Sequence, residues 1–406
     1  MAEHRHVDVA IIGAGIAGSA LAAALSGNGL SIALVEAQSL ARPGLPPERD
    51  LQHFDPRVSA ITPRSRQLLE TLGAWEAIDA YRQCSYTHMT VWDAEGTGAI
   101  EFDCAEVDAA ALGHIVENRA IVNALQQRIE GCSDITAFGE TRLLGCTRNG
   151  DLQQLCIELE GDTSLEADLL VAADGALSRV RDMMAFPTRE WAYGHRAIVT
   201  TVQVEHSHRD TCWQRFLTSG PLAFLPLPGE GGRHYCSIVW SQREELVDDL
   251  LALEDQAFCE ALEQAIEARL GKVMQCAPRF AFPLRQRHAI DYVQAGVALV
   301  GDAAHTIHPL AGQGINLGLQ DVAVLAEEVL AGHAKGVDPG QLALLGRYQR
   351  RRKGENLLMM AAMDGFKALF EQQALPVRWL RNAGMRGVNQ IGPLKQQLIR
   401  RAMGVG

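Results

Sequence analysis

The chain of 406 residues is long enough for two domains, or for one large α/β domain with an inserted second unit. No uninterrupted apolar run reaches the roughly eighteen residues of a membrane helix, and the nine cysteines follow no disulfide or metal spacing, so we expect a soluble protein of a reducing cytoplasm. The net charge is −12, and no nucleic-acid-binding motif accompanies the basic residues, which argues against nucleic acid as a partner.

The first predicted element is a strand, a tight turn and a helix near the amino terminus. An apolar run over Val7–Ile12 leads into Gly13-Ala14-Gly15-Ile16-Ala17-Gly18, and the small residues at 19–25 continue as a helix. Glycines are needed because the turn requires unusual backbone angles, a pyrophosphate approaches the main chain, and the helix packs closely on the strand. The pattern predicts a dinucleotide site built on Gly13, Gly15, Ala17 and Gly18.

An acidic residue follows these glycines at the expected distance. Glu36 closes a second apolar run, Ile32–Val35, where a carboxylate accepts hydrogen bonds from an adenosine ribose. A carboxylate also repels a 2′-phosphate, so NADP is not expected here. The alternatives are a chance match and a signal peptide over Ala10–Leu25, but Asp8 interrupts the basic-to-apolar junction that a signal peptide needs.

The chain then alternates between loops, helices and short strands. Residues 42–56 are rich in Pro and Arg and are predicted to form a loop over the nucleotide. Ordered structure is expected to resume from Arg57 to Ile61, and a helix is expected near residues 63–72. Residues 89–102 alternate as a hairpin, and residues 118–129 have helical spacing.

A return to parallel α/β structure is predicted around Asp174. The buried strand Leu169–Ala173 runs directly into Asp174-Gly175, and a helix is expected from about Ala176 to Arg181. This carboxylate, with Ser178, Arg179 and Arg181 just behind it, could hold a cofactor ribose or pyrophosphate and line the path of a transient nicotinamide donor. A plain Asp-Gly turn is the alternative.

Between Ala192 and Trp240 the apolar residues change to period two, which predicts an antiparallel sheet inserted as a substrate domain. Its segments Pro221–Leu227 and Cys236–Trp240 are candidates for a pocket wall, and ordinary sheet core is an equal alternative. Residues 244–270 are predicted to be helical.

A second glycine-bearing segment lies almost three hundred residues after the first. A short strand, Val297–Val300, leads into Gly301-Asp302-Ala303-Ala304-His305, where the carboxylate suits a polyol hydroxyl. A helix follows over residues 315–330, and its free N–H groups suit the pyrimidine edge of a flavin. The residues at this helix start are Pro309, Gly312, Gln313, Gly314, Ile315 and Asn316. A structural turn capped by Asp302 is the alternative; the pairing of the two segments favours the two ends of one FAD.

These elements predict an α/β fold with a Rossmann-like FAD-binding domain, an inserted antiparallel-sheet substrate domain and a helical C-terminal region. The predicted FAD-binding parts are residues 1–84, 116–186 and 285–335. The substrate-domain parts are residues 85–115 and 187–284, and the C-terminal basic helical region covers residues 336–406.

The motifs resemble those of the group A flavoprotein aromatic hydroxylases, which have the p-hydroxybenzoate hydroxylase type of fold. Within them, the chain resembles the ubiquinone-biosynthesis hydroxylases that act on polyprenylated phenols. The glycine fingerprint with Glu36, the Asp174-Gly175 pair and the Gly301-Asp302 pair indicate the larger family. The narrower match lies in RVSAI at residues 57–61, LGHIVEN at 112–118, GDAAHTIHPLAGQGINLG at 301–318 and QLIRRAMG at 397–404, so the resemblance covers nearly the whole chain.

The resemblance implies roles for these residues. Glu36 would bind the adenosine ribose, Arg57 would lie by the flavin, and Asp302 would bind the ribityl chain. The isoalloxazine would be bordered by Pro309 and by the backbone of residues 314–316, and touched by Asn118 or Arg119. Pro309 and His305 are the candidates for catalysis beside the flavin, although the family motif carries His305 and His308 as scaffold. No third ligand accompanies these histidines, so no metal is expected.

The implied reaction has two halves. FAD occupies the one dinucleotide fingerprint, so NADH or NADPH would bind transiently to reduce the flavin. O2 would then give a flavin C4a-hydroperoxide, which needs a covered apolar pocket and hydroxylates the aromatic ring of a polyprenylated phenol. On the substrate side, no single acid or base stands out: His195, Tyr193 and Tyr235 are all candidates, and residues of each kind are more often structural.

The tail suggests a location for the protein. Residues 341–406 contain twelve Lys or Arg against three Asp or Glu and are mostly helical, with breaks at Pro376 and Pro393. Their basic run Arg350-Arg351-Arg352-Lys353 is followed by apolar residues, which favours a cytoplasmic protein that is peripheral at the inner membrane or bound to other ubiquinone-biosynthesis proteins. A solvated basic face packed on its own domain is the alternative.

Other functions share the predicted flavin site. They are a hydroxylase of another aromatic substrate, a halogenase or prenyl-chain reductase of the same fold, and a non-catalytic FAD-binding member of a quinone-biosynthesis complex. A halogenase should show a lysine in a tryptophan-rich halide motif, and the sequence has none.

Overall fold

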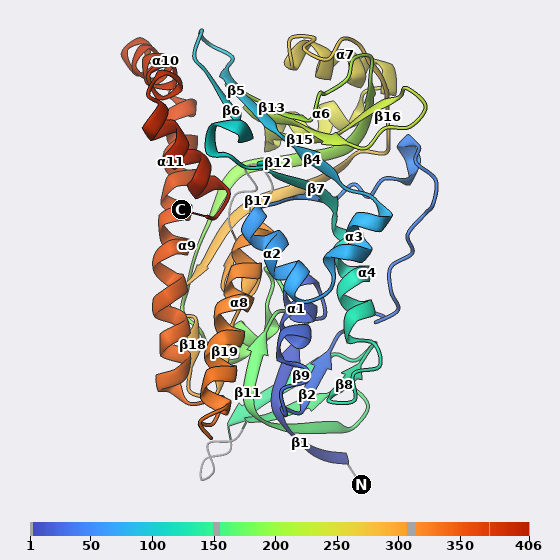
Figure 1. Cartoon of the computed structure of the whole chain (residues 1–406), viewed down its shortest axis with the longest axis vertical. Coiled ribbons are helices and arrows are strands. Elements are labelled where there is room, and N and C mark those ends of the chain that lie inside the picture. The colour runs from blue at the N-terminus through green and yellow to red at the C-terminus, as the bar shows by residue number, and fades with distance from the viewer. Residues whose placement is uncertain (1–2, 149–154, 307–313, 373, 406) are drawn as a thin grey trace.

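The computed structural model describes residues 3–148, 155–306, 314–372 and 374–405. They form three β-sheets surrounded by helices. Figure 1 shows the parallel strands in the lower part and, in the upper part, the large antiparallel sheet with α6 (Glu244–Ala252) and α7 (Asp255–Ala265). The long helix α9 (Leu342–Glu371) runs along one side.

The first sheet has a parallel core in the order β19-β11-β1-β2-β8, with the short strand β18 (Val293–Gln294) at one edge. Helix α1 (Ile16–Leu25) contacts both α4 (Asn118–Ile129) and α8 (Gly314–His333). The core strands are β1 (Glu3–Ile12), β2 (Ile32–Val35), β8 (Ile135–Phe138), β11 (Thr163–Ala172) and β19 (Val297–Leu299), and the antiparallel β9 (Leu143–Arg148) and β10 (Leu155–Leu159) extend β11.

This parallel arrangement brings three sequence motifs to one edge. The glycine turn follows β1, Asp174 follows β11 and Gly301 follows β19, and these three strands are neighbours in register. Ligands bind at the carboxyl ends of the strands in open α/β sheets. The predicted α/β fold with a Rossmann-like unit is confirmed.

The second sheet is largely antiparallel and contains the predicted inserted strands. α6 and α7 cover one of its faces with an apolar cluster. The strand β17 continues beyond the predicted boundary at residue 284, and the domain boundaries themselves stay a prediction. Its strands are β5 (His88–Asp93), β6 (Ala99–Asp103), β12 (Thr188–Val204), β13 (Thr211–Leu217), β14 (Gly220–Leu227), β15 (His234–Arg243), β16 (Val273–Cys276), β17 (Phe280–Ala289) and β20 (His305–Thr306).

A small third sheet, which the sequence does not predict as a unit, packs against the second. It contains β3 (Val58–Ile61), β7 (Gly113–Glu117) and β4 (Cys84–Tyr86). The helices α2 (Pro63–Thr71) and α3 (Trp75–Tyr81) stand between β3 and β4 in the chain. Within this sheet, His114 is buried against Trp75, with ring centroids 5.1 Å apart, and its Nε2 accepts a hydrogen bond from Arg66 Nη1 at 3.0 Å. Burial, together with the nearby Arg66 charge, lowers the pKa of His114 to about 4.

The last three helices lie along one outer edge of the molecule in Figure 1. α9 packs on α8, while α10 (Leu375–Gln390) and α11 (Gly392–Ala402) reach the second sheet. The buried guanidinium of Arg381 donates to Asp93 of β5, Nε to Oδ2 at 2.8 Å, and lies over the ring of Phe370. Among the described residues, no helix is both long and apolar enough to cross a membrane.

Replacing Asp93 by Ala should leave the Arg381 charge buried without its partner. We expect Asp93→Ala to lower the free energy of unfolding by about 3–5 kcal/mol, measured by denaturant titration. Asp248→Ala removes the exposed partner of Arg196 and is the control, with an expected loss below about 1 kcal/mol. Equal losses in the two variants would contradict this account of how α10 is anchored.

His114 should make the protein sensitive to acid. Its folded pKa of about 4 lies below the ordinary 6.5, so the unfolded chain binds a proton in this window that the folded chain does not. Stability should be retained above pH 6.5 and fall by up to about 3 kcal/mol between pH 6.5 and 4 through this residue. In His114→Gln, the free energy of unfolding should depend less steeply on pH in that window; an unchanged slope would assign the sensitivity elsewhere.

Candidate cofactor-binding site

The glycine turn after β1 leaves room for a ligand on one side only. Gly13 has φ +102°, and a Cβ there would lie 2.4 Å from the carbonyl oxygen of Ala173, so the protein itself requires this glycine. Gly15 is different, because a Cβ there would meet no atom within 4 Å. It is the N-cap of α1 and supplies no side-chain hydrogen bond, so the first N–H groups of the helix face this open space.

Glu36 lies at the end of β2 beside this turn. One carboxylate oxygen accepts a hydrogen bond from the N–H of Ala14 at 2.8 Å, and the other accepts from the N–H of Gln38 at 3.0 Å. Glu36 therefore orients the glycine turn. A carboxylate has about four acceptor positions, so capacity is left for a ligand hydroxyl.

The two glycine-bearing segments meet in space. A Cβ on Gly301 would lie 3.5 Å from the Cβ of Ala17, and the Cα of Gly301 also approaches Gly318 of α8. The first helix, the end of β19 and the start of α8 are thus packed together. This contact explains why small residues stand at these three positions.

Asp302 projects from the short turn that follows β19. Its side chain is accessible to solvent, yet protein atoms surround it, and this burial raises the pKa of its carboxyl. The charges of His305 and Arg57 oppose the rise. A carboxylate that solvent can reach has acceptor positions available for a hydroxyl of a ligand.

His305 is anchored by a buried network that the sequence does not predict. Its Nε2 lies 2.5 Å from Asp321 Oδ2, and the same oxygen accepts the N–H of Gly301 at 3.1 Å. Arg352 Nε donates to the other oxygen of Asp321 at 2.8 Å, and Asn356 Nδ2 lies 3.2 Å from it. These contacts hold the turn in place, and a catalytic role for His305 stays a prediction.

Polar residues inside the apolar stretch of α8 were the signal that could have found this network. Asp321 is fully buried in that helix. Arg352 belongs to the basic run that the sequence presents as a solvated or membrane-facing surface, and its side chain is also buried. For Arg352 that expectation was wrong, because a buried carboxylate of α8 requires a cation from α9.

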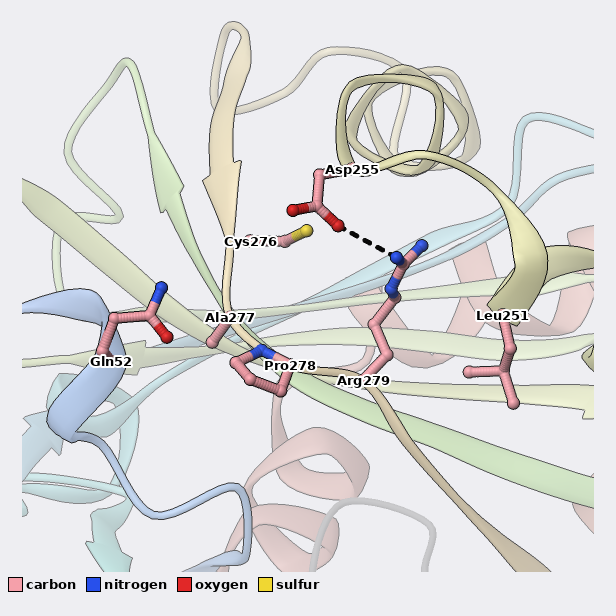
Figure 2. Close-up of a pocket in the computed structure, with 7 residues that line it drawn as sticks. All are labelled: Gln52, Leu251, Asp255, Cys276, Ala277, Pro278 and Arg279. Carbon is pink, nitrogen blue, oxygen red and sulfur yellow. Dashed lines mark hydrogen bonds and ion pairs between the residues drawn. The ribbon is translucent and has the colours of Figure 1, made fainter.

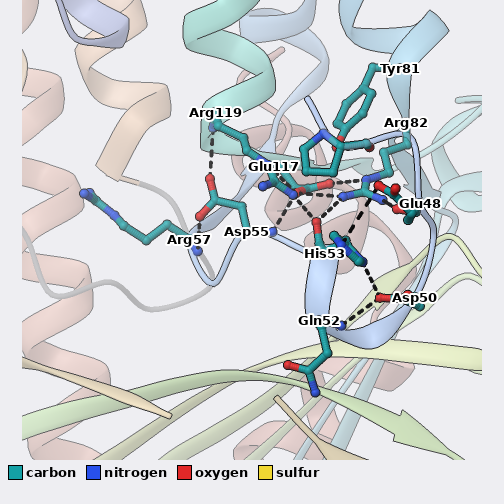
Figure 3. A network of polar contacts seen from close by, with 11 residues as sticks. Glu48, Asp50, Gln52, His53, Asp55, Arg57, Tyr81, Arg82, Glu117 and Arg119 are labelled. Carbon is teal, nitrogen blue, oxygen red and sulfur yellow. Dashed lines mark hydrogen bonds and ion pairs between the residues drawn. The ribbon is translucent and has the colours of Figure 1, made fainter. Parts of the chain in front are cut away.

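A second network holds the loop before Arg57, as Figure 3 shows. Asp55 accepts the N–H of Arg57 at 2.9 Å and the N–H of Arg119 at 3.1 Å. The Arg119 side chain pairs with buried Glu117, Nη2 to Oε2 at 2.6 Å, and Glu117 is also bonded by buried Arg82. The Arg57 side chain extends away from these residues.

The contacts bear on the choice between Asn118 and Arg119. Asn118 accepts a hydrogen bond from the hydroxyl of Ser59 at 2.7 Å, and Arg119 is engaged with Glu117 and with the carbonyl of His53. Both side chains therefore already have protein partners. Their contact with a cofactor stays a prediction, while Arg57 has the exposed guanidinium that such a contact needs.

The start of α8 is fixed by one side chain. Asn316 Nδ2 donates to the carbonyl of Ala60 at 2.8 Å, and its Oδ1 accepts the N–H of Thr62 at 3.0 Å. Gly314 and Ile315 stand in the first turn, half-buried. The predicted residues Pro309 and Gly312, together with His308 and Gln313, lie outside the described residues.

Asp174 lies at the same edge of the parallel sheet, and one of its carboxylate oxygens is available for a ligand. Its Oδ2 accepts the N–H of Arg179 at 2.8 Å, whereas Oδ1 is buried and has no hydrogen-bond partner among the described residues. Burial raises the pKa of this carboxyl. Arg181 is buried and donates to the carbonyls of Ala303 and Ala176, both at 3.1 Å, so it ties the Asp174 turn to the Asp302 turn.

The three substrate-side candidates are held by other protein groups. The Tyr193 hydroxyl donates to Asp364 Oδ1 at 2.7 Å, and His195 Nδ1 lies 2.8 Å from the carbonyl of Tyr193. Tyr235 is buried against Phe54, with ring centroids 5.4 Å apart. These contacts account for all three residues structurally, and an acid or base role stays a prediction.

Two other features of the described residues lie apart from the motifs. A surface hollow of about 450 Å³ is lined by Gln52, by the Asp255–Arg279 ion pair and by Cys276 (Figure 2), and it contains none of the predicted site residues. The side chains of Cys84, His208 and Asp210 cluster with ligand atoms within 4.8 Å. Both ring nitrogens of His208 already contact backbone groups, so the cluster is not arranged as a metal site.

Comparisons with known proteins agree with this geometry. Residues 6–361 match the family model described as "FAD binding domain". The chain is 38% identical to the 3-demethoxyubiquinol 3-hydroxylase of Escherichia coli over 98% of both chains. It is also 32% identical to the ubiquinone biosynthesis monooxygenase COQ6 of Homo sapiens, over 97% of this chain and 91% of that protein.

Solved structures show the same fold at low sequence identity. The p-nitrophenol 4-monooxygenase PnpA of Pseudomonas putida superposes with a TM-score of 0.77 at 17% identity, covering 98% of each chain. The structure of Pseudomonas aeruginosa PqsL with 2-aminobenzoylacetate gives 0.77 at 20% identity, over 94% of this chain and all of that one. The chain therefore belongs to the FAD-binding group A flavoprotein aromatic hydroxylases, in the family of the ubiquinone-biosynthesis hydroxylases.

Proposed function

We propose that this protein hydroxylates the aromatic ring of a polyprenylated phenol in ubiquinone biosynthesis, using FAD, NADH or NADPH, and O2. The observation that carries the proposal is the meeting of the two glycine-bearing segments at one sheet edge, with Asp302 and Asp174 beside them. Relatives named for ubiquinone hydroxylation that align over nearly the whole chain support the substrate class.

The residues at this edge fit FAD. The open space at Gly15 and the exposed N–H groups of α1 suit the pyrophosphate, and Glu36 would accept a ribose hydroxyl. Asp302 would hold the ribityl chain. The spare buried oxygen of Asp174 would gain a hydrogen-bond donor from the cofactor or from a nicotinamide.

The full set of residues proposed to bind the cofactor combines the residues above with others of the sequence motifs. It consists of Gly13, Gly15, Ala17, Gly18, Glu36, Arg57, Asn118, Arg119, Asp174, Gly301, Asp302, Pro309, Gly312, Gly314, Ile315 and Asn316. When bound, the flavin supplies the redox chemistry, and the first turn of α8 offers N–H groups and a positive dipole to its pyrimidine edge.

One face of the second sheet suits the aromatic substrate. Along β15, Ile238 and Trp240 belong to the cluster under α6 and α7, so Ser237, Val239 and Ser241 point to the opposite face. That face packs toward the third sheet. The hydroxyls of Ser237 and Ser241 are buried without a partner among the described residues, and a phenolic hydroxyl would satisfy them.

Asp302→Ala should weaken FAD retention. A hydroxyl of the ribityl chain would lose a charged acceptor, which is worth about 1.5–3 kcal/mol, or roughly ten- to hundredfold in affinity. Flavin absorbance after dialysis measures the retained fraction, and Asp248→Ala, on an exposed site, is the control. Retention at the wild-type level would move the ribityl contact to another residue.

Oxidation of NADH or NADPH should depend on a substrate that carries a phenol ring. With FAD-loaded protein, we expect NADH or NADPH oxidation to rise when a short-chain prenylated phenol is added, and mass spectrometry to detect a product with one more oxygen. The matched prenyl alcohol without a ring should not stimulate oxidation. Oxidation unaffected by any phenol would favour the non-catalytic FAD-binding alternative, and stimulation only by unprenylated phenols would change the substrate.

A further inference from the structure

The positive charge of the tail is concentrated in its last part. Residues 372–406 contain six Lys or Arg and no Asp or Glu, so their net charge is +6, and the total of −12 leaves −18 for the rest. Three of the four cations of the earlier basic run, Arg351, Arg352 and Lys353, form ion pairs within the protein. Arg351 pairs with Glu327 and Glu328, and Arg352 pairs with Asp321.

Helix α10 presents its inner face to the second sheet. Arg381 and Asn382 both bond Asp93, and Met385 is buried in a cluster with Phe216 and Phe370. These contacts fix the rotation of the helix about its axis. The residues on its other side must therefore face outward.

The outward side of α10 is apolar. Leu375, Trp379 and Leu380 are 75%, 68% and 62% exposed, respectively, and at 3.6 residues per turn they span an arc of about 140° on the solvent side of the helix. Exposed apolar side chains scattered singly are ordinary, but three large ones within six residues of one helix indicate a binding surface.

Unpaired cations accompany this surface. Arg386 on α10 and Arg400 and Arg401 on α11 are exposed, and none of them forms an ion pair with a described residue. α11 also exposes Leu394 and Leu398, four residues apart on the same side of the helix. α10 and α11 contact each other and lie together at the outer edge of the molecule (Figure 1).

We propose that the outer side of α10, with Leu375, Trp379 and Leu380, docks this protein onto a lipid bilayer that contains anionic lipid. Leu and Trp insert at the acyl boundary, where the amphipathic indole is favoured, and the arginines bind the headgroups. The body at −18 is repelled by an anionic surface, so electrostatics selects the orientation in which residues 372–406 face the lipid. The inference rests on the proposed function, because a polyprenylated substrate resides in the bilayer.

Vesicle flotation tests the docking surface. The FAD-loaded protein is mixed with vesicles of phosphatidylcholine alone or with phosphatidylglycerol added, and the bound fraction is measured. The wild type should bind the anionic vesicles and release them at high salt. The triple variant Leu375→Gln/Trp379→Gln/Leu380→Gln should have an affinity for these vesicles that is lower by about tenfold or more. Burial of a single large apolar side chain already contributes about a tenfold gain in affinity.

Matched variants separate this face from general stickiness. Leu144→Gln and Met274→Gln remove apolar side chains that are 53% and 54% exposed on other elements, and they should bind as the wild type does. Arg386→Gln/Arg400→Gln/Arg401→Gln should reduce binding and its salt dependence. Equal binding by the wild type and the Leu375/Trp379/Leu380 variant, or no binding by either, would overturn the proposal.

Two further readouts distinguish the other outcomes. If the Leu375/Trp379/Leu380 variant changes the oligomeric mass in solution and the wild type binds no vesicles, the face is an interface between copies of this chain. NADH or NADPH oxidation with a water-soluble short-chain phenol should be unchanged in that variant. If the wild type itself shows no such activity, the proposed function is refuted. The flotation result alone then still decides whether the docking surface exists.

Discussion

The carboxylate of Asp321 is the contact on which the proposed site depends most. Burial alone would raise its pKa, but the charges and hydrogen bonds of His305 and Arg352 outweigh burial, so the pKa is lower than the ordinary value. A charged carboxylate in the interior is costly unless it is paired. Its pairing with Arg352 of α9, His305 and the N–H of Gly301 therefore links the end of β19 to both long helices.

This constraint is reinforced from the other side of the same turn. Arg181 donates to the carbonyl of Ala303 and to that of Ala176, so the segment after β11 and the segment after β19 cannot move independently. Asp174 and Asp302 thus stand on a rigid support at the carboxyl edge of the parallel sheet. Rigid anchors of this kind hold a cofactor in one orientation relative to its substrate, which redox catalysis requires.

The sequence predicts local helices and strands better than the contacts between them. Ile32–Val35 and residues 118–129 occur where apolar pattern and helical spacing predicted them, because these patterns report burial directly. Residues 244–270 are two helices, α6 and α7, because the chain is extended at Leu253 and Glu254. The motif residues were identifiable from short-range pattern, whereas the pairing of Asp321 with Arg352 was not, because it depends on how α9 packs on α8.

The origin of the oxygen atom in the product tests the central claim most directly. The FAD-loaded protein is supplied with NADH or NADPH, a short-chain prenylated phenol and isotopically labelled dioxygen in ordinary water. The account predicts one labelled oxygen atom in each molecule of hydroxylated phenol. Product that carries oxygen from water, or label recovered only as hydrogen peroxide while the phenol stays unchanged, would contradict it.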